Sequence, residues 1–206
     1  MSGRVTVVDL GLGNLGSVLT ALGRAGGEPR LSSDAREIGR APRVVLPGVA
    51  AFGLGMERAQ GLGLRGGLDE AVHRGAPVLG ICLGMQILFE EGEEDGPRKG
   101  LGLLPGRVTR IPPGVQVPHI GWQRLEWTGA SPLLVDANAP WAYFAHSYRC
   151  EAPPEVTQAV ADHSGVRIAA VVGRGNVHGV QFHPEKSARG GEALLARFLR
   201  LPEGAP

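Results

Sequence analysis

The chain has 206 residues, 43% of them hydrophobic, and its 21 basic and 20 acidic side chains give a formal net charge of +1. This length predicts one domain spanning residues 1–206, and the apolar content excludes a disordered chain. The balanced charge, without a basic block, argues against nucleic-acid binding, and no apolar run is long enough to span a membrane. Two cysteines and no N-terminal leader pattern predict a reducing, cytoplasmic location.

The first part of the chain alternates strand and helix patterns. Residues 5–8 and 43–46 are apolar runs rich in β-branched side chains, which is typical of buried strands. Between them, residues 14–24 carry apolar side chains at helical spacing. Residues 62–74 are also helix-like, although Gly66-Gly67 should break this helix.

A further strand pattern at residues 76–81 leads directly into a helical run at residues 85–91. This alternating order predicts an α/β fold with a mostly parallel central sheet and helices on both faces. An acidic loop is expected at residues 90–99 and a closing amphipathic helix at 192–201. Between these two, short strand-like segments indicate antiparallel additions at the edge of the sheet: residues 107–111, 122–127, 141–144, 158–161, 168–172 and 177–182.

The junction of the 76–81 strand and the following helix is the most informative stretch. Gly80-Ile81-Cys82-Leu83-Gly84 places a cysteine between glycines in a tight strand-to-helix turn, which is the pattern of a nucleophile elbow. The helix N-terminus that follows should favour the thiolate of Cys82. The alternative is a small buried cysteine without chemistry.

A cysteine nucleophile needs a base, and residues 180–186 supply the candidate. His183 and Glu185 lie two apart in a segment that Pro184 should hold extended, so both side chains should point to one side. Glu185 would orient the ring, leaving its other nitrogen to face Cys82. A surface loop ending a strand is the alternative. Of the other histidines, His73 is expected on a helix surface, His163 in a polar turn and His178 at a structural position.

A different class of function is suggested near the N-terminus. Residues 11–16 match Gly-x-Gly-x-x-Gly between a strand and a helix, and Asp34 lies where a dinucleotide-binding fold places its ribose-binding acid. The alternative hypothesis is therefore an NAD-binding Rossmann domain. Against it, residues 29–33 make a poor strand, and the cysteine and histidine motifs are left without a role.

Taken together, the motifs resemble the class I (triad) glutamine amidotransferases, because Gly-x-Cys-x-Gly-x-Gln precedes a distant His-Pro-Glu. The N-terminal Gly-x-Gly-Asn and a Pro-His-x-Gly-Trp stretch make the chain similar to the glutaminase subunits of imidazole glycerol phosphate synthase. Subunits of the anthranilate, aminodeoxychorismate or pyridoxal phosphate pathways are the alternatives. The resemblance covers nearly the whole chain through segments in family order: residues 9–14, 46–49, 82–91, 100–106, 118–122, 144–148 and 183–187.

The resemblance implies that L-glutamine is hydrolysed to glutamate and ammonia through a thioester on Cys82, with His183 as base and Glu185 as its orienting carboxylate. No cofactor and no metal are expected. No acceptor site is visible in the chain, and the resemblance implies that the ammonia passes to a (β/α)8 cyclase subunit of imidazole glycerol phosphate synthase, in a heterodimer of histidine biosynthesis. A free-standing glutaminase is the alternative.

The tetrahedral oxyanion of such a reaction needs preorganised N–H donors. One donor is expected from Leu83, the residue after the nucleophile. The other should come from the loop that contains Gly48 and Val49, at the end of the second strand. The family usually has glycine where this chain has Ala50, which should stiffen this loop.

Glutamine itself would be recognised by its α-amino and α-carboxyl groups. The resemblance assigns this recognition to residues on the helix, the acidic segment and a later strand: Gln86, Glu94, Ser147 and Tyr148. Gln86 lies one helical turn after Cys82 and so on the same side of the helix. Candidates for the cyclase interface follow from the family segments: Gly11, Asn14, Pro118, His119, Trp122 and Lys186. For Trp122, packing against the sheet is the alternative.

Overall fold

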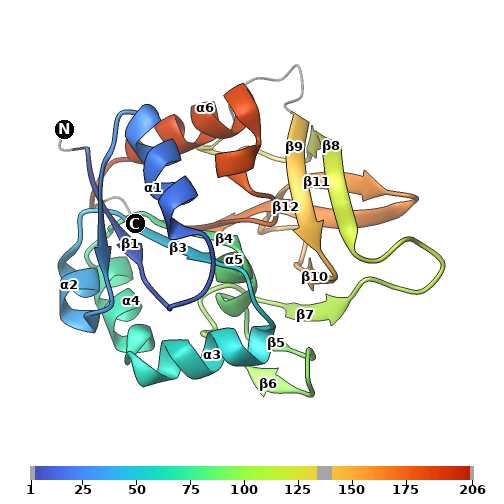
Figure 1. Ribbon diagram of the computed structural model, residues 1–206, viewed down its shortest axis with the longest axis horizontal. Coiled ribbons are helices and arrows are strands. Elements are labelled where there is room, and N and C mark those ends of the chain that lie inside the picture. The colour runs from blue at the N-terminus through green and yellow to red at the C-terminus, as the bar shows by residue number, and fades with distance from the viewer. Residues whose placement is uncertain (1–2, 134–140, 205–206) are drawn as a thin grey trace.

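The computed structural model describes residues 3–133 and 141–204 (Figure 1). Its main sheet begins with parallel strands, from β2 to β13, and continues with antiparallel strands, from β12 to β9. Across the sheet the described strands are β2 (Glu28–Ser32), β1 (Arg4–Val8), β3 (Val44–Gly48), β4 (Val78–Cys82), β13 (Val177–Val180), β12 (Val166–Arg174), β11 (Thr157–His163), β8 (His119–Trp127) and β9 (Trp141–His146). The predicted α/β fold with antiparallel edge additions is confirmed.

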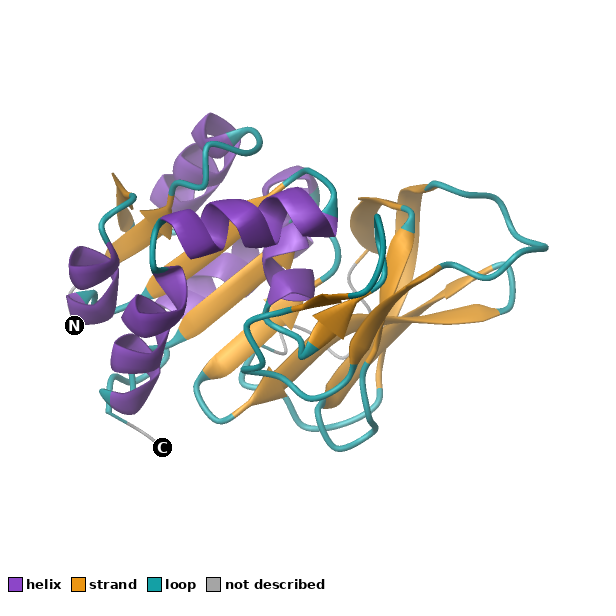
Figure 2. Ribbon diagram, turned by 90° about the horizontal axis from the view of Figure 1, so that it is seen from below, coloured by secondary structure: helices purple, strands orange, loops and turns teal. Residues whose placement is uncertain are grey.

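Helices cover both faces of the parallel half, as predicted (Figures 1 and 2). One face packs against α1 (Leu15–Arg24) and α6 (Ala188–Leu199), whose buried side chains share a core cluster with β1 and β4. On the other face lie α2 (Ala35–Arg40), α3 (Phe52–Gly61), α4 (Leu64–His73) and the short α5 (Leu83–Ile87). Figure 2 shows the antiparallel strands extending beyond the helices. None of the described helices is long and apolar enough to cross a membrane.

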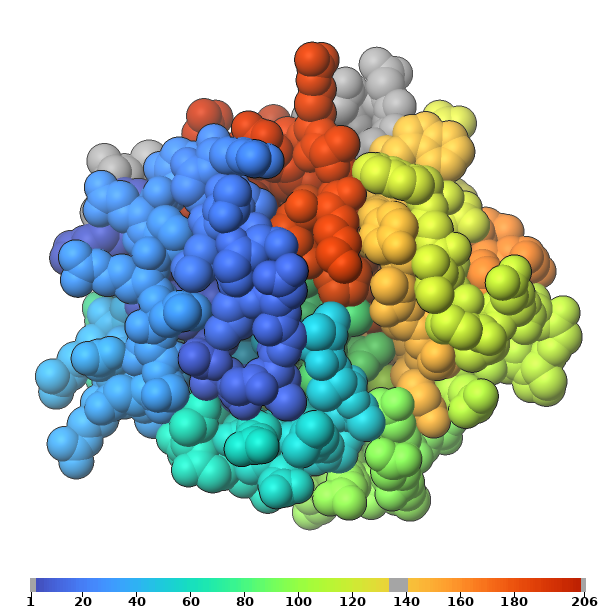
Figure 3. Space-filling model, in the orientation of Figure 1, coloured from blue at the N-terminus to red at the C-terminus, as the bar shows by residue number. Residues whose placement is uncertain are grey.

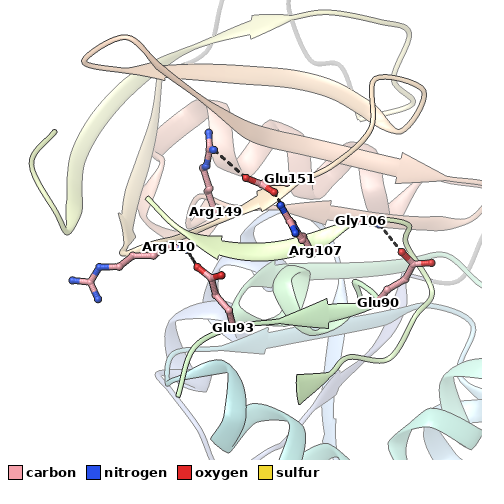
Figure 4. A network of polar contacts seen from close by, with 7 residues as sticks. All are labelled: Glu90, Glu93, Gly106, Arg107, Arg110, Arg149 and Glu151. Atoms are coloured by element: carbon pink, nitrogen blue, oxygen red, sulfur yellow. Dashed lines mark hydrogen bonds and ion pairs between the residues drawn. The ribbon is translucent and has the colours of Figure 1, made fainter. Parts of the chain in front are cut away.

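A second, smaller sheet lies beside the antiparallel strands. Its members are β10 (Tyr148–Glu151), β7 (Arg107–Arg110), β5 (Glu91–Gly92) and β6 (Arg98–Lys99). Figure 4 shows its polar contacts: the Glu151 carboxylate pairs with Arg107 at 2.8 Å and Arg149 at 3.1 Å, and Glu93 accepts from the Arg110 backbone N–H at 2.7 Å. The acidic loop expected at residues 90–99 is a short hairpin instead: β5 pairs with β6 and with β7, and residues 93–97 form the turn between β5 and β6.

Two elements differ from expectation near the N-terminus. Residues 28–32 form β2, although their polar sequence was interpreted as a poor strand. An edge strand tolerates polar residues and a proline, and among the described strands β2 pairs with β1 alone. Asp34, the ribose-binding candidate of the Rossmann hypothesis, instead caps α2 by accepting from the backbone N–H groups of Arg36 and Glu37. Asn14 caps α1 in the same way, at Ser17.

Two predictions about the helices also differ from the structure. Gly66-Gly67 does not break α4, because Gly67 lies where α2 approaches: a Cβ there would be 2.5 Å from the carbonyl oxygen of Ala35. The helix expected at residues 85–91 begins at Leu83 and ends at Ile87, after which the chain turns into β5.

The segment at residues 177–182 was expected among the antiparallel additions, but β13 runs parallel to β4 and so belongs to the parallel half. That residues 1–206 are one domain stays a prediction.

Candidate active site

The carboxyl ends of β3, β4 and β13 meet at one edge of the sheet, where open parallel sheets place their ligand sites. Gly48, at the end of β3, is paired in register with Cys82, at the end of β4. His183 follows the end of β13, the other neighbour of β4. Strand order alone therefore gathers the predicted nucleophile, its base and one oxyanion-loop residue.

Cys82 lies in a strained turn between β4 and α5. Its φ of +53° with ψ of −111° is unusual for a residue other than glycine. The flanking glycines are required by space: a Cβ on Gly80 would lie 2.6 Å from the Met85 nitrogen, and one on Gly84 would overlap the Leu46 carbonyl oxygen. The nucleophile elbow predicted from the sequence is present.

His183 and Glu185 are hydrogen-bonded, with 2.8 Å between Nδ1 and Oε1, and their side chains are only 4% and 7% exposed. The backbone geometry differs from the prediction. Pro184–Lys186 form a 3-10 turn rather than an extended segment, so the turn, not strand alternation, brings the carboxylate to the ring. Ser187 Oγ donates to the carbonyl oxygen of His183 at 2.6 Å and stabilises this turn.

Two opposing effects set the charge of His183. Burial lowers the pKa of this ring, but its interactions with Cys82 and with Glu185 outweigh burial and raise the pKa to about 9. The ring is therefore an imidazolium at neutral pH. Nδ1 is bonded to Glu185, so the buried Nε2 is the nitrogen that is left for Cys82. This charge state suits an ion pair with a thiolate.

A cavity of about 330 Å³ opens in front of Cys82. All of the substrate-binding candidates from the sequence line it: Gln86, Glu94, Ser147 and Tyr148. Leu83 and Val49 of the expected oxyanion hole line it as well, together with Ala50. Gly48 is not among the lining residues. Segments distant in sequence thus enclose one space at the nucleophile, and its size suits a small molecule.

Hydrogen bonds fix the position of two polar side chains of the cavity, Gln86 and Glu94. Gln86 Nε2 donates to the Tyr148 carbonyl oxygen at 3.0 Å and to Gln181 Oε1 at 3.2 Å. Glu94 Oε2 accepts from the Phe52 backbone N–H at 2.6 Å, at the first turn of α3. Burial raises the pKa of Glu94, and the bond from Phe52 opposes that rise. Among the described residues, no cluster of His, Cys, Asp or Glu could hold a metal ion.

Sequence reasoning assigned no role to Gln181 or His146. Gln181 is fully buried, with Nε2 at 3.8 Å from Cys82 Sγ, and His146 lines the cavity and donates from Nδ1 to the Tyr148 carbonyl oxygen at 2.8 Å. The sequence feature that could have pointed to both residues is a polar side chain within an apolar strand pattern. Such a side chain is buried with the strand and therefore needs a hydrogen-bond partner.

Comparison with known proteins identifies the family. Residues 32–201 match the family model for class-I glutamine amidotransferases. The chain belongs to the class I glutamine amidotransferase family. The chain is 48% identical over 200 residues to imidazole glycerol phosphate synthase subunit HisH of Symbiobacterium thermophilum, covering 96% of this chain and 94% of that protein. It is 42% identical over 203 residues to the HisH subunit of Bacillus subtilis (strain 168), with 96% of each covered. It is therefore an amidotransferase of the HisH group.

Solved structures agree on the fold. The structure of PurLQS from Thermotoga maritima matches with a TM-score of 0.76 and 23% identity, covering 97% of this chain and 98% of that one. A crystal structure of a glutamine amidotransferase matches with a TM-score of 0.72 and 22% identity, covering 93% and 98%. These likenesses support the amidotransferase fold, including its antiparallel extension.

One face of this amidotransferase carries most of the interface candidates. Figure 3 shows the segments near residue 12 (blue), 50 (cyan), 185 (red) and 145 (gold) around a hollow. Trp122 is 47% exposed, with its ring edge-on to Tyr143, and Lys186 Nζ lies 5.8 Å from the centre of that tyrosine ring. Of the alternatives for Trp122, the exposed position agrees with the interface rather than the core. Gly11, Asn14 and Pro118 are also exposed.

His119 is the exception among those candidates. Its side chain is 1% exposed, so the expectation that it contacts a partner is corrected. Its Nδ1 donates to His146 Nε2 at 3.0 Å, and its ring stacks on His163 at 4.1 Å between centroids. His163, expected in a polar turn, is buried at the end of β11 and donates from Nε2 to the Gln116 carbonyl oxygen. These three histidine rings pack together because β11, β8 and β9 are adjacent in the sheet.

Proposed function

We propose that this chain is the glutaminase subunit of an imidazole glycerol phosphate synthase. It hydrolyses L-glutamine at Cys82 and passes the ammonia to a cyclase subunit. The observation that carries the proposal is the strained Cys82 beside the His183–Glu185 pair, on a cavity whose lining includes the glutamine-binding candidates. The HisH group to which the chain belongs supports the pathway.

Acylation begins when Cys82 Sγ attacks the side-chain carbonyl carbon of glutamine. The carbonyl oxygen becomes an oxyanion, which accepts hydrogen bonds from the backbone N–H of Leu83 and from the loop of Gly48 and Val49. The imidazolium of His183 then gives its proton to the departing nitrogen, which leaves as ammonia. The product is a thioester on Cys82, and His183 is left neutral.

Deacylation reverses the role of the histidine. Neutral His183 takes a proton from water, whose oxygen attacks the thioester carbonyl carbon. The carbon–sulfur bond breaks, its electron pair returns to Cys82 as the thiolate, and glutamate leaves. Glu185 stays hydrogen-bonded to Nδ1 through both steps and stabilises the imidazolium whenever it forms.

Recognition of the amino-acid end follows from charge. The carboxylate of Glu94 suits the α-ammonium group of glutamine, and the amide of Gln86 with the backbone at Ser147 and Tyr148 suits the α-carboxylate. These groups line the same cavity as the nucleophile. A substrate held at both ends presents its side-chain carbonyl to Cys82.

The partner is a (β/α)8 cyclase subunit that forms a heterodimer with this chain. Gly11, Asn14, Pro118, Trp122 and Lys186 are the proposed contacts, because all five are exposed. Asn14 and Lys186 also line a pocket with Val49 and His183, and Pro118 lines the cavity at Cys82. A cytoplasmic location suits the chemistry, since a reducing compartment keeps the free thiol of Cys82 available.

Mixing this chain with a cyclase subunit tests the proposal. With glutamine, the mixture should release glutamate and form the imidazole product. Cys82→Ser should abolish both reactions with glutamine, while an ammonium salt should still support product formation. Glutamate release that needs an anthranilate, aminodeoxychorismate or pyridoxal phosphate synthase subunit instead would contradict the pathway, and glutamate release by Cys82→Ser would contradict the chemistry.

A further inference from the structure

We infer that Gln181 is a further catalytic residue of this site, whose side-chain amide donates a hydrogen bond to the sulfur of Cys82. The inference rests on the proposed function and adds a second donor to the nucleophile beside His183. The side chain of Gln181 is 0% exposed, and its Nε2 lies 3.8 Å from Cys82 Sγ. A carboxamide buried this deeply is stable only when its polar atoms are hydrogen-bonded.

The backbone explains why the amide reaches the sulfur. Gln181 directly follows β13, and its backbone N–H donates to the Ala170 carbonyl oxygen of β12 at 3.0 Å, which fixes it to the sheet. His183 comes two residues later and is still extended, with φ of −98° and ψ of 96°. Alternate residues of an extended segment point to the same side. One strand end therefore presents both an imidazole and a carboxamide to Cys82.

Neighbouring groups decide which end of the Gln181 amide faces the sulfur. The Tyr148 carbonyl oxygen can only accept, so the atom of Gln86 bonded to it is the NH₂ group. The same NH₂ group donates to Gln181 at 3.2 Å, which makes that atom of Gln181 the oxygen. The remaining atom, the NH₂ of Gln181, is the one at Cys82. A single main-chain carbonyl thus sets the orientation of two amides in series.

Cys150 on β10 supports the same orientation. Its Sγ lies 3.9 Å from Gln181 Oε1 and is buried. Burial raises the pKa of Cys150 well above its usual value, and the nearby Cys82 raises it further, so Cys150 remains a thiol that donates. The oxygen of Gln181 therefore faces two donors, and its nitrogen faces the one sulfur that the proposed mechanism uses as a thiolate.

The chemical consequence concerns the charge on sulfur. A hydrogen bond from a neutral amide favours the charged thiolate over the thiol. During deacylation the electron pair of the carbon–sulfur bond returns to sulfur, while the proton of the attacking water goes to His183. Gln181 then stabilises the thiolate as it leaves the acyl carbon. Through Oε1 it also holds Gln86, which lines the glutamine cavity.

Two substitutions separate these effects. Gln181→Met keeps the volume but loses both the donor and the acceptor. Gln181→Glu keeps an acceptor for Gln86 but puts a carboxylate where the donor was. Gln158→Met is the matched control, because Gln158 lies on β11 and its amide bonds Ser131 outside the cavity. The described titratable groups around Cys82 are unchanged in all of these: His183, Glu185, Cys150, Glu94 and His146.

The measurement is the rate at which iodoacetamide alkylates Cys82 over a range of pH. Peptide mass spectrometry follows the alkylation, and circular dichroism first shows that each protein is folded. Both Gln181 variants should shift the profile to higher pH by about one unit, the size expected for one hydrogen bond to a charged acceptor. Gln158→Met should match the wild type. In steady-state assays with the cyclase, Gln181→Glu should lower kcat at least about tenfold with little change in KM, whereas Gln181→Met should change both.

Alkylation profiles of both Gln181 variants that coincide with the wild type overturn the inference. If Gln181→Met does not fold, Gln181→Glu decides alone, and circular dichroism together with co-elution with the cyclase subunit shows that it is intact. Alkylation does not require glutamine. A wild-type chain that releases no glutamate even in the presence of the cyclase and its nucleotide ligand would therefore overturn the proposed function, while the alkylation profiles would still decide the role of Gln181.

Discussion

His183 and Glu185 form a hydrogen bond of 2.8 Å between Nδ1 and Oε1, inside the fold and beside Cys82. Although the two residues are close in sequence, the bond depends on the 3-10 turn that Pro184 begins. This bond orients the ring and leaves Nε2 for the sulfur. The pair is therefore a base with a fixed direction, and its two members should differ in how much activity they carry.

Replacing His183 should cost most of the activity. His183→Asn removes the group that moves the proton, so glutamate release by the complex should fall by about a thousandfold. Glu185→Gln should cost less, because the amide oxygen can still accept from Nδ1 and orient the ring. His73→Asn, on the exposed side of α4, is the control and should be silent. Equal steady-state rates for the wild type and His183→Asn would contradict the assignment.

The buried histidines should make the protein sensitive to acid. Burial lowers the pKa of His178 to about 4, that of His146 to about 4 and that of His119 to about 3. An unfolded histidine takes up its proton near pH 6.5, so the unfolded chain binds more protons and stability falls as the pH falls from 6.5 toward 4. His183 acts in the opposite direction, since its pKa is raised to about 9 and its contribution is lost as the pH rises through that value.

Urea unfolding at pH 7.5 and pH 5 measures this sensitivity. Each fully buried neutral histidine should remove about 2 kcal/mol between these two conditions. His178 lies on β13 away from the cavity, so His178→Gln should reduce the stability difference between the two pH values by about that amount. An unchanged difference in the variant would show that His178 is not held neutral by burial.

Adjacent glycines in α4 give a test of packing. A Cβ on Gly66 would meet no atom within 4 Å, whereas one on Gly67 would lie 2.5 Å from the Ala35 carbonyl oxygen. Gly66→Ala should therefore stabilise the protein by about 1 kcal/mol through helix propensity. Gly67→Ala should destabilise it by about 1–3 kcal/mol, because α2 must move away. Urea unfolding of both variants decides, and changes of the same sign would contradict this packing.

The N-terminal loop offers a route from partner to active site. A Cβ on Gly13 would lie 2.8 Å from Val49 Cγ2, so this loop packs directly on the expected oxyanion loop. We predict that the cyclase with its nucleotide ligand stimulates glutamate release at least about tenfold, which requires only ~1.4 kcal/mol of differential binding. Gly13→Ala should reduce the stimulation, and Gly23→Ala, which meets no neighbour within 4 Å, should not. An isolated chain as active as the complex would contradict this predicted stimulation.

The sequence predicts best what is local. The elbow at Cys82 could be predicted because glycines, a strand and a helix start are contiguous there, and the His183–Glu185 pair because it lies within one short motif. The polar edge strand β2 could not, because its place depends on pairing with β1 rather than on its own side chains. The break expected in α4 was wrong for the same reason, since α2 decides what fits at Gly67.

The contacts among the buried polar residues of the site could not be predicted from local sequence patterns. Gln181 meets Gln86 and Cys150 only because β13, α5 and β10 converge, and the His119–His146 bond joins β8 to β9. The glutamine-binding candidates came from the family resemblance alone. The structure gathers them on one cavity with Cys82, while their roles remain proposals.

Covalent labelling tests whether Cys82 is the nucleophile of this site. A chloroketone analogue of glutamine should enter the cavity and alkylate its nucleophile, and peptide mass spectrometry then identifies the cysteine. We expect one adduct per chain, on Cys82 and not on the buried thiol of Cys150, in proportion to the loss of glutaminase activity. Glutamine should protect against labelling, and ammonium-dependent synthesis with the cyclase should survive. A label on Cys150, or loss of activity while Cys82 remains unmodified, would contradict the account.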